Sequence, residues 1–525
     1  MATIGASAAS PSGTMRAPAD LIGGRWVPIP GQTIRSENPA HPSETVWSGS
    51  PVQGHVDEAV GAARGAFREW SRWPFERRAG VLHRFKQIAT ARVDAMAALI
   101  RDEVGKPLWD AKAEAQLLGA KVDITLDSGP EGSLRRVSPY EVSMGAAMPT
   151  RRGQAWFRPH GVMAVLGPFN FPAHLPNGHI VPALALGNTV VFKPSDKAPA
   201  CGQLLAEFFQ EALEAEHAPA GVLNLVQGHA PIAAALASHR DIDGVLFTGS
   251  WPVGRRIMEA NLDHPGRILA LEMGGNNPAV ILPDADLKQA VIECVRCAFI
   301  TAGQRCTCTR RLIVHRQVAD RVIPALCKAA SQLIIGDPRA EHPVFMGPVI
   351  SEASRRDILE AQRAMQKAGG EALVLATALD RDGWFMSPGV MRVERFTTGR
   401  DLSSEAGADV EIFGPLLRVA VVDSLEDALE QANTTQYGLA ASLFTHDQRA
   451  IEAFRHECRA GCINVNTGTA GASSKLPFGG LGQSGNHRPA GSFSVDYCAY
   501  PVAGMVETAD AAQISPGMRF DDGWL

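Results

Sequence analysis

The chain has 525 residues, more than one hydrophobic core normally holds, so two or three domains are expected. Its formal net charge of -5, without a long basic run, gives no bulk attraction to nucleic acid or anionic membranes. Its apolar runs are too short for a bilayer span, and nine cysteines, sparse and odd in number, favour reduced thiols over a disulfide framework. We therefore expect a soluble, cytoplasmic globular protein that binds neither nucleic acid nor membrane.

Residues 1–18 are rich in Ala, Ser and Gly and lack the apolar core of a secretory signal, which predicts a flexible extension. From about residue 56 to residue 121, apolar residues recur at three- and four-residue spacing, as in helices. The pattern then changes to short apolar runs that alternate with helical segments. This change is typical of an α/β sheet.

Two series of alternating strands and helices follow. The first is predicted to contain buried parallel strands at residues 162–166, 189–192, 222–226 and 244–247 and helices at 176–186, 201–213, 231–239 and 253–261. The second is predicted to contain strands at 279–282, 311–314, 416–422, 440–444 and 462–465 and helices at 287–302, 318–333, 425–432 and 448–457. The sequence therefore predicts two α/β domains that meet near Leu271.

Three extended segments are expected to lie outside both sheets, at residues 140–144, 155–158 and 492–502. An arm used in assembly would explain them, and an ordinary surface hairpin would explain them equally well.

A candidate nucleophile and a candidate base lie in the second series. Cys306 follows Gly303-Gln304-Arg305, and Glu272 precedes Met273-Gly274-Gly275. Attack by a thiolate needs small flanking residues that admit a substrate, and a second group that activates water. Gly303 and Glu272 meet these needs. A buried, structural cysteine is the alternative that the context must exclude.

Loops at the carboxyl ends of parallel strands gather ligands, so three of them are candidate binding loops. Asn170 follows the first strand and offers an amide to an oxyanion. After the second strand, Lys193 and Asp196 are suited to the hydroxyls of a ribose. After the fourth, residues 247–250 lead to Gly254 just before a helix, where backbone donors can face a pyrophosphate. Ordinary turns are the alternative for each loop taken alone.

Two nucleotide motifs are excluded. Arg255-Arg256 stands where a P-loop requires Lys and Ser or Thr. The G-x-G-x-x-G pattern of residues 480–485 follows no strand of a βαβ unit and precedes Asn-His-Arg-Pro, which does not open a helix cleanly. A conformationally demanding loop explains it better.

Metal binding is not expected, since Cys294 and Cys297 lack a second pair of ligands and a packed helix face explains them better. Cys308, two residues after Cys306, raises the hypothesis of a reversible Cys306–Cys308 disulfide under oxidation. A structural role for Cys308 remains the leading alternative.

These motifs together resemble the aldehyde dehydrogenase superfamily. They occur in family order from about Leu21 to Val502: residues 167–172, Lys193, 247–254, 271–275, 303–306, 411–415, Asn464 and 477–480. Within the superfamily, residues 170–179, 273–278, 303–308 and 484–489 are similar to those of enzymes that oxidise succinylglutamate semialdehyde in arginine degradation. The implied fold is two doubly wound α/β domains with a β arm for oligomerisation, and the implied assembly is a homodimer or homotetramer.

The resemblance also assigns boundaries and roles. It implies a flexible extension (1–18), an NAD-binding domain (19–139 and 157–271), a catalytic domain (272–480), an oligomerisation arm (140–156 and 490–503) and a C-terminal tail (504–525). It implies catalysis by Cys306, Glu272 and Asn170. It implies NAD binding by Lys193, Ser195, Asp196, Phe247, Thr248, Gly249, Ser250, Gly254, Glu411 and Phe413.

Two departures from the family pattern bear on specificity. Asp196 replaces the more usual Glu, yet its charge still disfavours a 2′-phosphate, so NAD is predicted over NADP. Residues 466–471 differ from the expected pattern near the substrate mouth, which leaves the exact aldehyde open.

The substrate is expected to be polar and acidic. Gly178 and the small residues 468–474 predict a wide tunnel, and Arg305, His487 and Arg488 are candidate partners of substrate carboxylates. N-succinyl-L-glutamate 5-semialdehyde is the first candidate, and succinic and 2-oxoglutaric semialdehydes are alternatives. An acylating enzyme is disfavoured because Glu272 is present, and a non-catalytic NAD-binding scaffold is the remote alternative.

Overall fold

The computed structural model describes residues 15–146, 148–510, 512 and 514–525. Most of the predicted N-terminal extension, residues 1–14, therefore lies outside the described residues. Within the described part, no helix has both the length and the apolar composition that crossing a membrane requires.

The first large sheet has the strand order β11-β10-β7-β8-β9-β1-β2. The bounds are β1 Ala19–Ile22, β2 Arg25–Pro28, β7 Val162–Leu166, β8 Thr189–Lys193, β9 Leu223–Leu225, β10 Gly244–Thr248 and β11 Ile268–Glu272. The strands from β7 to β11 are parallel, whereas β1 runs antiparallel to β9 and to β2. The predicted strands of this series are confirmed, and the N-terminal hairpin at the sheet edge is an addition.

Helices cover both faces of this sheet. Their bounds are α1 His55–Trp70, α2 Phe75–Ala91, α3 Val93–Val104, α4 Leu108–Leu126, α5 His174–Ala185, α6 Pro199–Ala215, α7 Ala230–Ser238 and α8 Trp251–Ala260. The side chains of β7 alternate between the two faces of the sheet. Val162 and Ala164 pack with α1, α7 and α8, whereas Met163 and Val165 pack with α2 to α6. This alternation with period two gives the sheet a hydrophobic core on each face.

The second large sheet has the order β14-β15-β16-β13-β12-β17-β18. Its bounds are β12 Asn277–Ile281, β13 Thr309–His315, β14 Glu371–Val374, β15 Gly389–Arg392, β16 Leu416–Val422, β17 Ala440–Phe444 and β18 Cys462–Val465. It is parallel except for β14. Its helices are α9 Leu287–Phe299, α10 Arg316–Ser331, α11 Glu352–Lys367, α12 Leu425–Asn433 and α13 Gln448–Glu457. The predicted architecture of two α/β units is confirmed.

Several helices of the second unit begin at side-chain caps that the sequence supplies. Asp286 accepts a hydrogen bond from the Gln289 amide at 3.0 Å before α9, and Ser424 accepts one from the Asp427 amide at 3.1 Å before α12. Such caps satisfy amides that the first turn of a helix leaves without partners.

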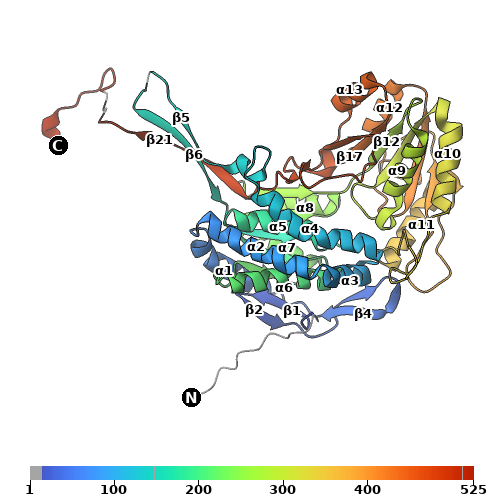
Figure 1. The fold of residues 1–525 in the computed structure, drawn as a ribbon, viewed down its shortest axis with the longest axis horizontal. Coiled ribbons are helices and arrows are strands. Elements are labelled where there is room, and N and C mark those ends of the chain that lie inside the picture. The colour runs from blue at the N-terminus through green and yellow to red at the C-terminus, as the bar shows by residue number, and fades with distance from the viewer. Residues whose placement is uncertain (1–14, 147, 511, 513) are drawn as a thin grey trace, which may run out of the picture.

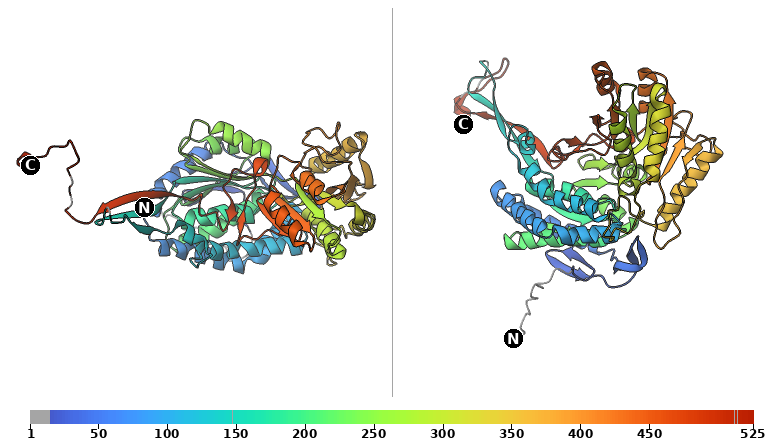
Figure 2. Two further views of the ribbon diagram at one scale, coloured as in Figure 1. Left: turned by 90° about the horizontal axis from the view of Figure 1, so that it is seen from above. Right: turned by 45° about the vertical axis from the view of Figure 1, so that its right-hand side comes forward.

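A separate sheet in the order β21-β6-β5 projects from the body of the molecule in Figure 1 and in both views of Figure 2. Its strands are β5 Tyr140–Ser143, β6 Arg151–Pro159 and β21 Ala499–Glu507, so the three segments predicted outside both large sheets contribute to it. Two small ladders complete the fold, β3 Ile34–Asn38 with β4 His41–Gly49, and β19 Pro477–Phe478 with β20 Ala490–Gly491.

Candidate active site

A cavity of about 1150 Å³ lies where the strands of the first sheet end. Leu166, Lys193, Thr248 and Glu272, the last residues of β7, β8, β10 and β11, all line it. Residues 409–413 and Cys306 of the second unit line it too. The carboxyl edge of a parallel sheet is the usual ligand site of such folds, and this cavity brings the predicted motifs together.

Cys306 lies on the loop between α9 and β13. Asn277 fixes the backbone of this loop, because its side-chain amide donates to the carbonyls of Cys306 at 2.6 Å and Cys308 at 2.8 Å. Burial, together with the charges of Glu411 and Glu272, raises the pKa of the Cys306 thiol to about 12. Without a cofactor the site therefore favours the thiol over the thiolate.

Gly303 allows this loop to adopt a left-handed backbone conformation close to a second loop. It has φ +69, and a Cβ added there would come within 2.2 Å of the Gly414 carbonyl oxygen. Thr301 and Ala302 also adopt left-handed conformations, with φ 55 and 51. The expectation that Gly303 is small to admit substrate is replaced by a close approach between two backbones.

Glu272 is 5% exposed, and burial raises the pKa of its carboxyl well above the usual range. Its Oε2 is buried and meets no hydrogen-bond partner among the described residues. The loop of the rejected G-x-G-x-x-G pattern packs against it: the Met273 amide donates to the Ser484 carbonyl at 2.9 Å, and Glu272 forms a β-bridge with Gly485. That loop therefore supports the candidate base.

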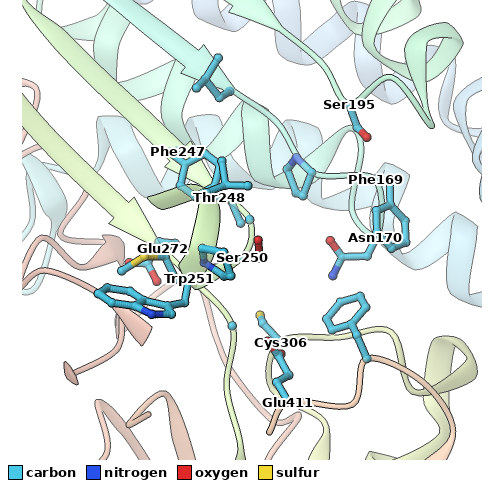
Figure 3. A pocket seen from close by; sticks show the side chains of 18 of the residues that line it. Phe169, Asn170, Ser195, Phe247, Thr248, Ser250, Trp251, Glu272, Cys306 and Glu411 are labelled. Carbon is cyan, nitrogen blue, oxygen red and sulfur yellow. The ribbon is translucent and has the colours of Figure 1, made fainter. Parts of the chain in front are cut away.

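Asn170 lies on the loop between β7 and α5 and is 5% exposed. Figure 3 shows its amide and the Cys306 sulfur directed into the same space. Just after it, the amides of Ala173 and His174 both donate to Glu114 Oε1 at 3.1 Å, which fixes the start of α5. This arrangement suits an amide that must donate to an oxygen beside the sulfur.

The residues predicted to bind the adenosine ribose line one end of the cavity. Burial lowers the pKa of Lys193 to about 8, and its Nζ donates to the Pro194 carbonyl at 2.7 Å. The Asp196 carboxylate lies 2.7 Å from Nδ1 of His229, a partner that the sequence analysis missed. His229 is 33 residues away in the chain, so no local pattern announces it.

The predicted pyrophosphate and nicotinamide residues are largely brought together. The cavity is lined, just before α8, by Phe247, Thr248, Gly249 and Ser250. It is also lined by Glu411 and Phe413 of the second unit. Gly254 is placed differently: α8 begins at Trp251, so Gly254 lies inside the helix, and a Cβ there would meet Met273 Sδ at 2.3 Å. It allows close packing of the helix.

Glu411 is held by the loop that follows Glu272. The Gly275 amide donates to its Oε1 at 3.0 Å, and burial raises the pKa of its carboxyl. A Cβ on Gly274 would lie 1.8 Å from its Oε2, so only glycine leaves room for this carboxylate. Next to it, the Phe413 ring packs edge-on against Phe169 with centroids 5.9 Å apart.

The predicted substrate residues are not gathered in this cavity. The Arg305 guanidinium donates to Asp110 and Thr301, at 2.6 and 2.8 Å. Gly178 lies in α5, and a Cβ there would meet no atom within 4 Å in the described part of the chain. His487 and Arg488 are exposed on the loop before β20. Arg305 is thus engaged within the protein, and Gly178 borders open space.

Cys308 is fully buried, its sulfur 3.9 Å from the Ile300 carbonyl oxygen, and burial raises the pKa of its thiol. All nine cysteines lie in the described part of the chain, and all are free thiols. The Cys306–Cys308 disulfide stays a hypothesis.

A second side chain that the sequence analysis missed is Arg310, which is 1% exposed. It donates to the carbonyls of Gly303 at 2.6 Å, Gly414 at 3.1 Å and Arg305 at 3.0 Å, and so ties the nucleophile loop to the loop of Glu411. The sequence does indicate such a role. Arg310 and Arg311 are adjacent at the start of an apolar strand, where burial of a charged side chain is unfavourable unless it finds hydrogen-bond partners.

Residues 26–501 match the Aldehyde dehydrogenase family. An N-succinylglutamate 5-semialdehyde dehydrogenase of Paraburkholderia xenovorans (strain LB400) is 42% identical over 506 residues, which cover 95% of this chain and 99% of that protein. A 1-pyrroline-5-carboxylate dehydrogenase from Thermus with bound NAD has a TM-score of 0.85 at 29% identity and covers 94% of this chain and 93% of its own. An NADP dependent enzyme of E. coli has a TM-score of 0.85 at 28% identity, covering 94% and 98%.

A thiol, a buried carboxyl and an amide thus meet in a cavity at the end of a parallel sheet, in a chain that matches one family over nearly its whole length. The protein belongs to the aldehyde dehydrogenase family.

Proposed function

We propose that the protein uses NAD to oxidise a polar semialdehyde, N-succinyl-L-glutamate 5-semialdehyde, to the carboxylate, as in arginine degradation. The observation that carries this proposal is the meeting of Cys306, Glu272 and Asn170 in one cavity. The identity of 42% to a relative named for this substrate supports the choice of aldehyde.

The first step assigns attack on the aldehyde carbon to the Cys306 thiolate. The carbonyl oxygen becomes an oxyanion, which the Asn170 side-chain amide and the Cys306 backbone amide stabilise by hydrogen bonds. The product is a thiohemiacetal on Cys306. Asn277 serves this step by fixing the carbonyls of Cys306 and Cys308.

The lining of the cavity fits a dinucleotide. Its volume of about 1150 Å³ exceeds the ~300–1,000 Å³ of most small-molecule sites, as an extended ligand requires. Lys193, Ser195 and Asp196 would hold the adenosine ribose, the amino end of α8 the pyrophosphate, and Glu411 the nicotinamide ribose. When bound, NAD supplies a hydride acceptor and a positive charge beside Cys306.

The last step is hydrolysis of the Cys306 thioester. Glu272 accepts a proton from water, the hydroxide adds to the thioester carbonyl, and the Cys306 sulfur leaves as the carboxylate forms. Burial raises the pKa of the Glu272 carboxyl, so it must first lose its own proton, and the carboxylate is then a stronger base toward water than an exposed one. This base argues against the acylating alternative, in which another acceptor takes the acyl group.

NAD is proposed over NADP on the charge of Asp196. Its carboxylate would repel a 2′-phosphate, and the His229 ring, whose Nδ1 lies 2.7 Å away, is the partner of that carboxylate. Similar solved structures include one with bound NAD and one described as NADP dependent, so the preference must come from this chain's own residues.

Oligomerisation through the β21-β6-β5 sheet is also part of the proposal. Its exposed apolar side chains include Tyr140, Val142, Met505 and Val506, which are 43–66% exposed. A projecting sheet with open edges is a ready surface for a second copy of the chain. We propose a homodimer or homotetramer built on this surface.

The direct test follows NADH absorbance with N-succinylglutamate, succinic, 2-oxoglutaric and short aliphatic semialdehydes. The highest kcat/KM is expected for the succinylated substrate, and the Cys306→Ala variant should be inactive. The Glu272→Gln variant should release about one NADH per active site and then stall, because hydrolysis needs the base. Activity that survives in Cys306→Ala would refute the mechanism, and higher kcat/KM for another aldehyde would replace the substrate.

A further inference from the structure

Helix α4 (Leu108–Leu126) places two buried acids one helical turn apart behind the active site. Asp110 and Glu114 are 2% and 1% exposed. An i,i+4 pair lies on one face of a helix, so both carboxylates are directed to the same side. Each of them binds a different loop of the catalytic site.

Asp110 holds the loop of the nucleophile. Its Oδ2 accepts a hydrogen bond from Thr301 Oγ1 at 2.6 Å, and its Oδ1 accepts one from Arg305 Nη2 at 2.6 Å. Arg305 Nε donates to Thr301 Oγ1 at 2.8 Å, which closes a triangle of three side chains. The triangle spans the left-handed residues before Cys306, a conformation that persists only when its surroundings fix it.

Glu114 holds the loop of the oxyanion donor. Its Oε1 accepts from the amides of Ala173 and His174, three and four residues after Asn170. Its Oε2 accepts from Lys106 Nζ at 2.7 Å in a pair whose side chains are 0% exposed. Both carboxylate oxygens of Glu114 are therefore engaged, which gives this buried pair a defined geometry.

The hydrogen bonds of Asp110 form one clamp and those of Glu114 form a second. Both clamps reach the ring of Phe171, the residue next to Asn170. Lys106 Nζ lies 3.5 Å from the centroid of the Phe171 ring, and the Arg305 guanidinium lies 4.9 Å from it. Arg305, which precedes Cys306, and Lys106, which pairs with Glu114, thus contact the same ring. Helix α4 and this ring connect the nucleophile to the oxyanion donor across the two units.

We propose that Asp110 and Glu114 are positioning residues that set the distance between the Cys306 sulfur and the Asn170 amide. The proposal rests on the proposed catalytic roles of these two residues. A purely structural role for the clamps would affect every property of the loop alike. A positioning role affects reactions that need sulfur and amide together.

Two reagents separate the roles, and neither needs an aldehyde or a cofactor. With p-nitrophenyl acetate, the Cys306 sulfur bonds to the ester carbonyl carbon, p-nitrophenolate leaves with the electrons of the broken C–O bond, and the thiol proton passes to solvent. The carbonyl oxygen of the ester carries the negative charge of the tetrahedral intermediate before the C–O bond breaks. With iodoacetamide, the sulfur displaces iodide from carbon and no oxyanion forms.

The Asp110→Asn variant should acylate about 100-fold more slowly than the wild type, since misplacement of about 1 Å costs that much. Its alkylation of Cys306, followed by mass spectrometry, should change by less than about threefold. In an Asn170→Ala background, Asp110→Asn should slow acylation by less than about threefold, because the shared amide is already absent. The control is Asp123→Asn, which breaks an exposed ion pair between Asp123 of α4 and Lys86 of α2. Its rates of acylation and alkylation should match those of the wild type.

A second pair of variants covers the case in which Asp110→Asn does not fold. Thr301→Val removes the hydroxyl of the triangle and should slow acylation, whereas Thr301→Ser keeps the hydroxyl and should restore it. Equal losses in acylation and alkylation, or no loss in either, would overturn the proposal. If wild-type acylation proceeds but no aldehyde is oxidised, the proposed function fails while the positioning role still stands to be judged on acylation.

Discussion

At the scale of residues, the reactivity of Cys306 is set by burial and by two carboxyls. Burial, then Glu411, then Glu272 raise the pKa of its thiol to about 12. The nucleophile therefore rests in its unreactive form, and a positive charge brought beside it shifts the balance toward the thiolate. Such a site protects its thiol until the cavity is filled.

This predicts a steep pH dependence of the free enzyme. Below the pKa of Cys306, the thiolate fraction rises about tenfold per pH unit, so the rate of alkylation by iodoacetamide should climb without a plateau from about pH 7 to about pH 10. Glu411→Gln removes a negative charge near the sulfur, lowers the pKa of Cys306 and should speed alkylation at about pH 9. Glu360→Gln, an exposed change on α11, is the control; a plateau below about pH 8 in the wild type would contradict the prediction.

A second residue-scale prediction concerns cofactor choice. His229 Nδ1 lies 2.7 Å from the Asp196 carboxylate, and both side chains are more than a third exposed, so the pair stabilises by roughly 0.2–1 kcal/mol when the imidazole is protonated. His229→Ala leaves Asp196 without this partner and strengthens its repulsion of a 2′-phosphate. The ratio of kcat/KM for NAD to that for NADP should rise about two- to fivefold. His239→Ala, which breaks a comparable pair with Asp57, should leave the ratio unchanged.

At the scale of elements, the loop between α9 and β13 is shaped by close backbone contacts. Gly303 has φ +69 and lies against the Gly414 carbonyl, and Arg310 ties the same two loops together. The loop that bears Cys306 and the loop that bears Glu411 therefore move as one piece. A change in either is expected to reach the other.

Gly303→Ala tests this contact. The added Cβ would meet the Gly414 oxygen at 2.2 Å, so we expect a loss of more than about 3 kcal/mol in the free energy of unfolding, and little activity. Gly369→Ala is the matched control, because Gly369 has φ +88 but a Cβ there meets no described atom within 4 Å. It should cost about 1–2 kcal/mol, the strain of the left-handed conformation alone. Equal losses in chemical denaturation would contradict the contact.

The elements that the sequence predicted correctly are those with strong periodicity. Strands such as Leu416–Val422 and Ala440–Phe444 are buried apolar runs between clear breaks, so their bounds were predicted to the residue. The strands β1, β2 and β3 have only four or five residues, β4 is longer but rich in polar residues, and α11 buries only a few side chains, so their patterns are weak. The architecture could be predicted, together with the edge strand Cys462–Val465, but the hairpin of β1 and β2 and the edge strand β14 could not.

The candidate site divides in the same way. Cys306, Glu272 and Asn170 stand in recognisable segments, and the structure places them in one cavity. Their partners are set by tertiary contact: Asp110 reaches Arg305 across 195 residues, and His229 reaches Asp196 across 33. Arg305 looked like a reader of substrate carboxylates because sequence alone does not reveal which buried acid already pairs with it.

At the scale of the whole molecule, the β21-β6-β5 sheet is the feature that leaves the compact body (Figure 2). If it carries the proposed assembly, a charge placed on it should weaken association, because an apolar contact would then bury an unpaired carboxylate. Val142→Asp should shift the sedimentation coefficient toward that of a monomer. Leu262→Asp alters a side chain that is 77% exposed away from this sheet and should have no effect. A wild-type monomer would contradict the proposed assembly.

The pairing of β6 also constrains the order in which the chain can be completed during synthesis. Strand β6 pairs with β5 through a short connection, but its other edge is covered by β21, where Arg151 is opposite Glu507. Until residues 499–507 have been synthesised and have left the ribosome, that edge of β6 stays open to other strands. A chain released before β21 has been made would thus expose an unpaired edge of β6, to which strands of other chains could bind.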